Sequence, residues 1–214
     1  AGYAAPAFSG SDTAIYVGTG ATGYGTLIHQ AQRGGEAYSS TGGVPSVGPN
    51  RISYLFNWHG PSEPVETACS SSLIAMHRGM AALQSGESAV AIVGGVNTIV
   101  TPEAHISFDK AGMLSADGRC KTFSSEANGY VRGEGAAMLV LKRLSDAERD
   151  ADRIYGLLRG TAENHGGRAN SLTAPNPRAQ AAVVRRAYQQ AGIDPRTVSY
   201  IEAHGTGTPL GDPV

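Results

Sequence analysis

Hydrophobic positions along the chain follow two periodicities, one typical of buried strands and one typical of helices. An apolar run at residues 13–18 predicts a strand that enters a glycine-rich loop, and the run at 88–95 predicts a strand buried on both faces. Between these runs, apolar side chains recur at helical spacing after Ser70, and Gly86 ends the pattern. The residues that define this helix are Leu73, Met76, Met80 and Leu83.

The rest of the chain continues this alternation of strand and helix. Helices are expected at residues 50–57 with Asn50 as the cap, at 102–112 with Pro102 in the first turn, and at 177–192. Further strands are expected at residues 64–68, 135–144, 153–162 and 198–205. Alternating strands and helices predict an α/β fold in which helices cover sheets, and no repeat, linker or domain boundary is visible.

Composition narrows the class of protein. The chain has 214 residues, a net charge of −1 and no long basic run, which argues against nucleic acid as a partner. Its longest apolar run is too short to cross a bilayer, and its start lacks the features of a signal peptide. Two cysteines and no metal-ligand spacing such as CxxC or HExxH indicate a cytoplasmic protein with free thiols and no bound metal.

The two ends suggest a longer parent chain. The sequence begins without methionine, and Asp212 and Pro213 have the character of a helix cap and a first helical residue. We therefore expect a fragment truncated at both ends.

A glycine motif, GTGATG at residues 18–23, follows the first predicted strand. The same pattern binds dinucleotides when a regular helix and a second strand follow it. Here the next residues form at best a short helix that Gly25 interrupts, and Glu36 sits at no convincing strand end. A glycine-rich turn is the favoured interpretation.

Cys69 lies where a short apolar strand meets the long helix. A helix N-terminus presents free N–H groups and partial positive charge, which favour the reactive thiolate. The backbone N–H of Cys69 can then point at the oxygen of a bound thioester as one donor of an oxyanion hole. From position alone, a nucleophile and a small buried cysteine are equally plausible.

His204 strengthens the hypothesis of a catalytic site. It is expected at the end of an apolar strand, before a loop rich in glycine and threonine, and ligands of α/β folds gather at such ends. A histidine there can donate a hydrogen bond to an oxyanion or exchange a proton. The alternative is a histidine whose ring is satisfied by loop backbone. His165, in a glycine loop, is expected to border a pocket.

Three motifs together indicate a protein family more specifically than Cys69 or His204 does alone. The stretches TACSSSL around Cys69, CKTFSSEANGYVRGEG from Cys120, and EAHGTGTPLGDP around His204 resemble the β-ketoacyl synthase family. The resemblance covers essentially the whole chain. More narrowly, the chain resembles the ketosynthase domains of modular bacterial type I polyketide synthases. HGPSEPVETACSSS and NHGGRANSLTAPNP resemble the subgroup whose acyltransferase is a separate protein.

This resemblance implies a thiolase-like layered α-β-α-β-α fold, normally a homodimer, with residues 1–214 as the central part of one ketosynthase domain. Cys69 matches the acyl-accepting nucleophile and His204 the first of two catalytic histidines. Thr206 and Thr208 match positions that line the path of the phosphopantetheine arm, and Cys120 matches a packed structural cysteine. The second histidine, a lysine and the other oxyanion-hole segment are expected outside this chain.

The implied reaction transfers an acyl group from acyl carrier protein to Cys69 and condenses it with a malonyl-type thioester. No metal or redox cofactor is implied; the partners are acyl carrier protein and other polyketide synthase domains. A fatty-acid β-ketoacyl synthase and a ketosynthase that transfers acyl chains without elongation stay open as alternatives. A cysteine hydrolase would need an identifiable residue to orient His204, and a decarboxylating loading domain would carry glutamine in place of Cys69.

Overall fold

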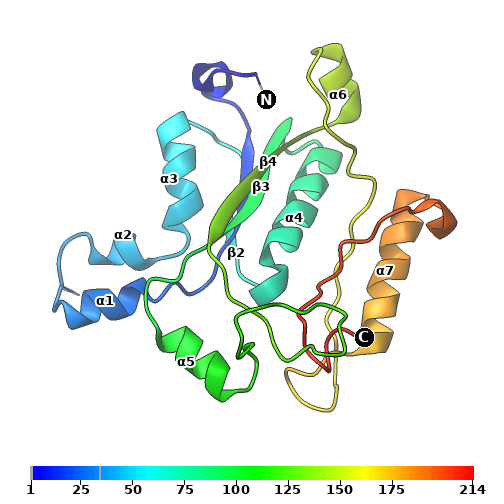
Figure 1. Ribbon diagram of the computed structural model, residues 1–214. Helices are drawn as coiled ribbons and strands as arrows, with labels where there is room; N and C mark the ends of the chain where they lie inside the picture. The colour runs from blue at the N-terminus through cyan, green and yellow to red at the C-terminus, as the bar shows by residue number, and fades with distance from the viewer. Residues whose placement is uncertain (1, 34) are drawn as a thin grey trace. The chain divides into compact units, whose positions relative to one another are not determined.

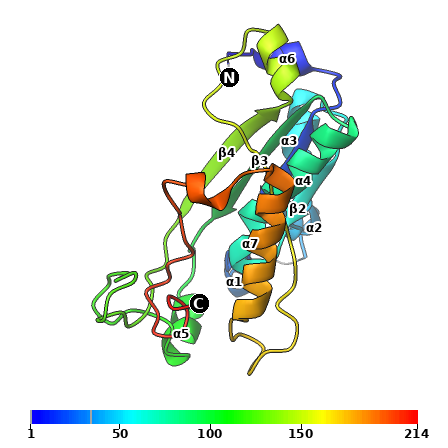
Figure 2. The same ribbon diagram turned by 90° about the vertical axis from the view of Figure 1, so that its right-hand side faces the viewer.

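The computed structural model describes residues 2–33 and 35–214, which form two compact units (Figures 1 and 2). Unit 1 comprises Ala1–Thr101 and Gly133–Leu157. Unit 2 comprises Pro102–Arg132 and Leu158–Val214.

Unit 1 is built on a four-stranded sheet with the strand order β2-β1-β3-β4. Its strands are β1 (Ala14–Gly18), β2 (Ser62–Val65), β3 (Val90–Asn97) and β4 (Gly135–Lys142). β1 pairs in parallel with β2 on one side and with β3 on the other, whereas β4 is antiparallel to β3. The strands expected near residues 13–18, 88–95 and 135–144 are confirmed, and β2 begins two residues before the expected 64–68.

Two helices cover the sheet of unit 1. Figure 1 shows α3 (Val47–Phe56) and α4 (Ser71–Ser85) on opposite sides of the strands. α4 packs across β1 and β3, and it buries Ala75, Ala82 and Leu83 in a common core with them. The core therefore lies between this helix and the two central strands.

Helix ends in unit 1 agree only partly with the sequence. Gly86 ends α4 in the left-handed conformation, with φ of 81°, as the glycine predicts. Asn50 is not a cap, because α3 already begins at Val47. Pro49 is compatible with the first turn of the helix, and Ser46 before it makes no side-chain capping hydrogen bond. The short helix allowed after the glycine motif is observed as α1 (Tyr24–Gln30), which runs through Gly25. Two other short helices, α2 (Ser39–Gly43) and α6 (Leu144–Arg149), were not expected from the pattern.

An ionic cluster joins the first residues of the chain to the end of β4. The Lys142 ammonium donates to Asp150 Oδ2 and, at 2.7 Å, to Asp152 Oδ2, while Tyr3 donates to Asp152 Oδ1. Hydrogen bonds from Arg149 and Lys142 lower the pKa of Asp150 to about 2. This cluster keeps the N-terminal segment beside the sheet at neutral pH.

Unit 2 contains two α-helices, α5 (Glu103–Lys110) and α7 (Pro177–Ala191), and a short 3₁₀ helix η3 (Pro195–Thr197). The Asn176 side chain caps α7 by accepting from the backbone N–H groups of Arg178 and Ala179, and Gly192 ends it with φ of 62°. The predicted helix at 177–192 is thereby confirmed. In residues 2–33 and 35–214, no helix has both the length and the apolar character needed to cross a membrane.

The strands predicted at residues 153–162 and 198–205 are wrong. Neither segment belongs to a β-ladder in the part of the chain that the structure describes. Apolar residues such as Tyr155 and Tyr200 are strongly exposed there, at 85% and 75%. Apolar sequence favours an extended backbone, but a strand also needs a neighbour that pairs with its N–H and C=O groups.

Candidate active site

Cys69 lies in the connection between a strand and a helix of unit 1. β2 ends at Val65, a short 3₁₀ turn η2 (Ala68–Ser70) contains Cys69, and α4 begins at Ser71. The side chain of Cys69 is exposed. Because β1 has parallel neighbours on both sides, the carboxyl ends of β1, β2 and β3 share one edge, where α/β folds bind ligands.

Hydrogen bonds within the turn hold its backbone in an uncommon conformation. Ala68, immediately before Cys69, has φ of 55°, a left-handed value that costs an L-residue roughly 1–2 kcal/mol. Glu66 Oε1 accepts from the Ala68 N–H at 2.9 Å. The Ser71 hydroxyl accepts from the Thr67 N–H at 2.9 Å and donates to the Ala68 carbonyl at 2.6 Å. Strained backbone of this kind is common at functional sites.

Two glycines allow the start of α4 to approach the sheet closely. A Cβ placed on Gly18, the last residue of β1, would lie 2.7 Å from the Ser72 backbone nitrogen. A Cβ on Gly95 of β3 would lie 3.0 Å from the Ser72 Cβ. The first glycine of the GTGATG motif therefore has a packing role, in agreement with the glycine-rich turn favoured above.

Substituting Gly18→Ala is expected to displace the N-terminal turn of α4, because the new methyl group meets backbone atoms that cannot rotate away. We expect the free energy of unfolding to fall by about 1–3 kcal/mol and thioester acylation of Cys69 to slow. Thermal unfolding and peptide mass spectrometry measure the two effects. Gly20→Ala is the matched control, since nothing lies within 4 Å of that position. Equal behaviour of the two variants would contradict the close approach.

The other three candidate residues, His204, Thr206 and Thr208, lie together in one loop of unit 2. His204 is exposed, and its predicted place at the end of a strand is not observed, since residues 198–205 have no ladder partner in the described chain. The hydroxyls of Thr206 and Thr208 share a hydrogen bond of 2.9 Å. Gly207 between them is buried with φ of 68°, and a Cβ there would lie 3.0 Å from the Lys121 nitrogen.

Asp212 ties this loop to the segment that follows Cys120. Its carboxylate accepts from the Gly207 N–H at 3.0 Å and from the Phe123 N–H at 2.6 Å. Thr122 also donates through its hydroxyl to the Gly205 carbonyl at 2.7 Å. The loop conformation around His204 thus depends on residues far away in sequence.

Cys120 differs from the expectation that it is packed. Its side chain is exposed, although the Val131 N–H donates to its sulfur at 3.1 Å. It therefore serves as a natural comparison for the reactivity of Cys69.

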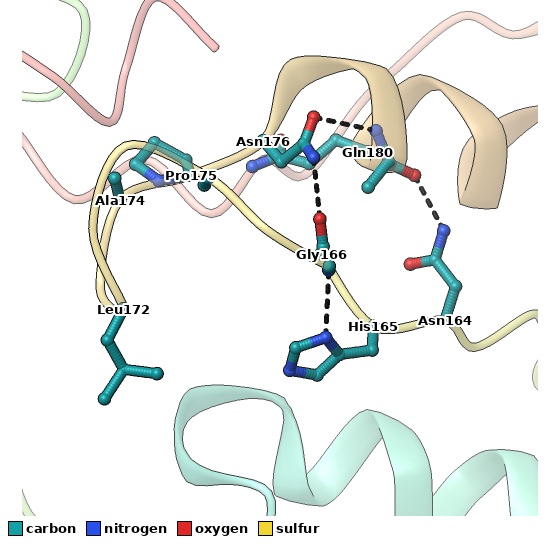
Figure 3. Close-up of a pocket in the computed structure, with 11 residues that line it drawn as sticks. Asn164, His165, Gly166, Leu172, Ala174, Pro175, Asn176 and Gln180 are labelled. Atoms are coloured by element: carbon teal, nitrogen blue, oxygen red, sulfur yellow. Dashed lines mark hydrogen bonds between the residues drawn. The ribbon is translucent and has the colours of Figure 1, made fainter.

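His165 borders a cavity of about 290 Å³, as its glycine loop predicts (Figure 3). Its Nδ1 accepts from the Gly167 N–H at 2.9 Å, which places the ring proton of the neutral form on Nε2. Figure 3 shows Asn176 between the Gly166 carbonyl and the first turn of α7. This cavity lies within unit 2 and contains none of the four candidate residues.

The sequence did not predict which residues support the turn that contains Cys69 and the loop that contains His204. Ser71 is one of three consecutive serines in the motif TACSSSL, and its burial, with 6% exposure, depends on tertiary packing. The sequence predicts Asp212 as a helix cap, and it does not predict that the Asp212 carboxylate accepts from the amides of Gly207 and Phe123. No local pattern distinguishes these roles.

Comparison with known proteins gives matches along the whole chain. Residues 1–147 match the β-ketoacyl synthase N-terminal domain, and residues 155–214 match the β-ketoacyl synthase C-terminal domain. Polyketide synthase PksN of Bacillus subtilis (strain 168) is 59% identical over 214 residues, which are 100% of this chain and 4% of that protein.

Solved structures agree with this match. The ketosynthase from module 6 of the bacillaene synthase of Bacillus subtilis 168 superposes with a TM-score of 0.91 at 43% identity, covering 99% of this chain and 36% of that one. The oxazolomycin ketosynthase domain OzmH KS7 of Streptomyces albus JA3453 gives 0.93 at 42% identity, covering 100% and 38%. The α/β class and the thiolase-like fold are thereby confirmed, and the chain spans little more than a third of these structures.

Proposed function

Because the chain belongs to the β-ketoacyl synthase family, we propose that residues 1–214 are part of a ketosynthase domain that extends a polyketide. The 59% sequence identity to PksN and the structural similarity to the bacillaene and oxazolomycin ketosynthases favour this function over fatty-acid synthesis. The subgroup whose acyltransferase is a separate protein is part of the proposal. The observation that carries it is an exposed cysteine in the turn between a parallel strand and a helix N-terminus.

In the first step the Cys69 thiolate attacks the carbonyl carbon of an acyl thioester carried on phosphopantetheine. The carbonyl oxygen takes up negative charge, and the Cys69 backbone N–H is one donor that stabilises it. The bond between that carbon and the carrier sulfur then breaks. The carrier thiolate leaves and takes a proton, and the acyl group stays on Cys69 as a new thioester.

In the second step a malonyl-type thioester on a carrier protein loses carbon dioxide. The electron pair of the broken carbon–carbon bond forms an enolate, and His204 donates a hydrogen bond to the enolate oxygen. The enolate carbon attacks the acyl carbon on Cys69, the bond to the Cys69 sulfur breaks, and a β-ketothioester remains on the carrier. Thr206 and Thr208 line the path of the phosphopantetheine arm.

The proposal includes partners and location. The polyketide synthase relatives support acyl carrier protein as the source of both substrates and other synthase domains as neighbours. A homodimer is proposed on the same family basis. The chemistry requires no metal or redox cofactor, since both steps exchange electron pairs between carbon, sulfur and oxygen. Free thiols and the absence of a membrane-spanning helix in the described residues are compatible with the cytoplasm.

The proposal is tested by supplying the full-length protein with an acyl-pantetheine thioester and a malonyl-loaded carrier protein. We expect a β-ketothioester two carbons longer than the acyl group and one carbon dioxide per product, measured by mass spectrometry of the carrier arm. Acylation without elongation would instead identify a transferring ketosynthase. Release of free acid without acyl transfer to the carrier would identify a hydrolase.

A further inference from the structure

The hydroxyl of Ser71 bridges two backbone groups that flank the strained residue before Cys69. It accepts from the Thr67 N–H and donates to the Ala68 carbonyl, at 2.9 and 2.6 Å. The Ser71 backbone N–H also donates to the same Ala68 carbonyl. Ser71 is 6% exposed, so water has little access to replace these contacts.

The Ala68 carbonyl belongs to the peptide group that also carries the N–H of Cys69. In a trans peptide the C=O and N–H groups point in opposite directions. Fixing the carbonyl toward Ser71 therefore fixes the Cys69 N–H away from Ser71. Ala68 has φ of 55°, a conformation that is unfavourable without such support.

We propose that Ser71 is a positioning residue that orients the Cys69 backbone N–H as the oxyanion donor for acyl transfer. This inference rests on the proposed function of Cys69 as nucleophile. Ser71 itself touches neither the acyl group nor the sulfur in this role. Without its hydroxyl, the Ala68 carbonyl keeps only the hydrogen bond from the Ser71 backbone N–H, and the Thr67 N–H loses its acceptor. The peptide between Ala68 and Cys69 is then held less firmly, so the Cys69 N–H points less consistently at the developing negative oxygen.

Two reactions of the same sulfur separate this role from a general structural one. Acylation by a pantetheine thioester passes through an oxyanion, and the pantetheine thiolate leaves. Alkylation by iodoacetamide displaces iodide directly at carbon and forms no oxyanion. A residue that orients the N–H affects the first rate alone, whereas a residue that only maintains the fold or the thiol environment affects both.

The experiment measures both rates at the Cys69 peptide of the full-length protein by mass spectrometry. Ser71→Ala is expected to slow acylation by about tenfold to a hundredfold, less than the roughly 100- to 1,000-fold loss seen when an oxyanion donor is removed altogether, and to leave alkylation unchanged. Ser71→Thr, which keeps the hydroxyl, is expected to restore acylation. Ser70→Ala is the matched control, because the Ser70 hydroxyl contacts Thr67 and not the Ala68 carbonyl.

Equal slowing of both reactions, unchanged acylation in Ser71→Ala, or failure of Ser71→Thr to restore it would each overturn the proposal. If Ser71→Ala does not fold, Ser71→Val gives the same comparison, because valine matches the shape of the threonine in Ser71→Thr and lacks only the hydroxyl. Absence of acylation on Cys69 in the unaltered protein would refute the proposed function instead. Acylation of Cys69 that is indifferent to Ser71 refutes the positioning role alone.

Discussion

Replacing Cys69 by alanine is expected to abolish covalent acylation and all condensation, because no other group then carries the acyl chain between the two carrier proteins. Peptide mass spectrometry after incubation with an acyl-pantetheine thioester should show the acyl mass on the Cys69 peptide in the unaltered protein. The same peptide should carry no acyl group in the variant. The thermal unfolding midpoint should change little, since the side chain is exposed.

Cys120→Ala is the matched control for this prediction. Cys120 is also a free and exposed thiol, but it lies in a loop of unit 2 and not beside a helix N-terminus. Its replacement should leave acylation of the Cys69 peptide and product formation intact. If acyl labelling persisted in Cys69→Ala and disappeared in Cys120→Ala, the nucleophile would be Cys120 and the assignment of Cys69 would be wrong.

Replacing His204 by alanine is expected to separate the two steps of the reaction. Acylation of Cys69 should persist, because the proposed role of His204 is to stabilise the enolate oxygen in the second step. Loss of one such donor typically slows a reaction about 100- to 1,000-fold. Carbon dioxide release from the malonyl-loaded carrier and formation of the β-ketothioester should fall together by that factor.

His29→Ala serves as the comparison, because His29 is an exposed histidine of α1 with no role in the proposed chemistry. Normal elongation by His204→Ala would exclude His204 as the enolate donor. Loss of acylation together with elongation would place His204 in the first step. Thermal unfolding of both variants shows whether the fold is retained.

The sequence predicted most of the helices that are stabilised by their own residues and the strands that lie in the centre of the sheet. α4 and α7 are both confirmed, because their apolar spacing, the glycine that ends each helix and, for α7, the Asn176 cap are local features. The strands at 153–162 and 198–205 were wrong, since pairing depends on another segment of chain. α6 was missed because its charged sequence has no apolar stripe, although Arg143 and Arg149 pair with Asp146 along it.

The sequence by itself determined the family, the cysteine between a strand and a helix, and the loop with His204, Thr206 and Thr208, because motif chemistry is carried by adjacent residues. Tertiary structure alone decided what holds these loops. Ser71 faces the Ala68 carbonyl, Gly18 admits the start of α4, and Asp212 binds amides at 123 and 207. Such contacts depend on three-dimensional packing, since the same serine, glycine or aspartate has no partner until the chain folds.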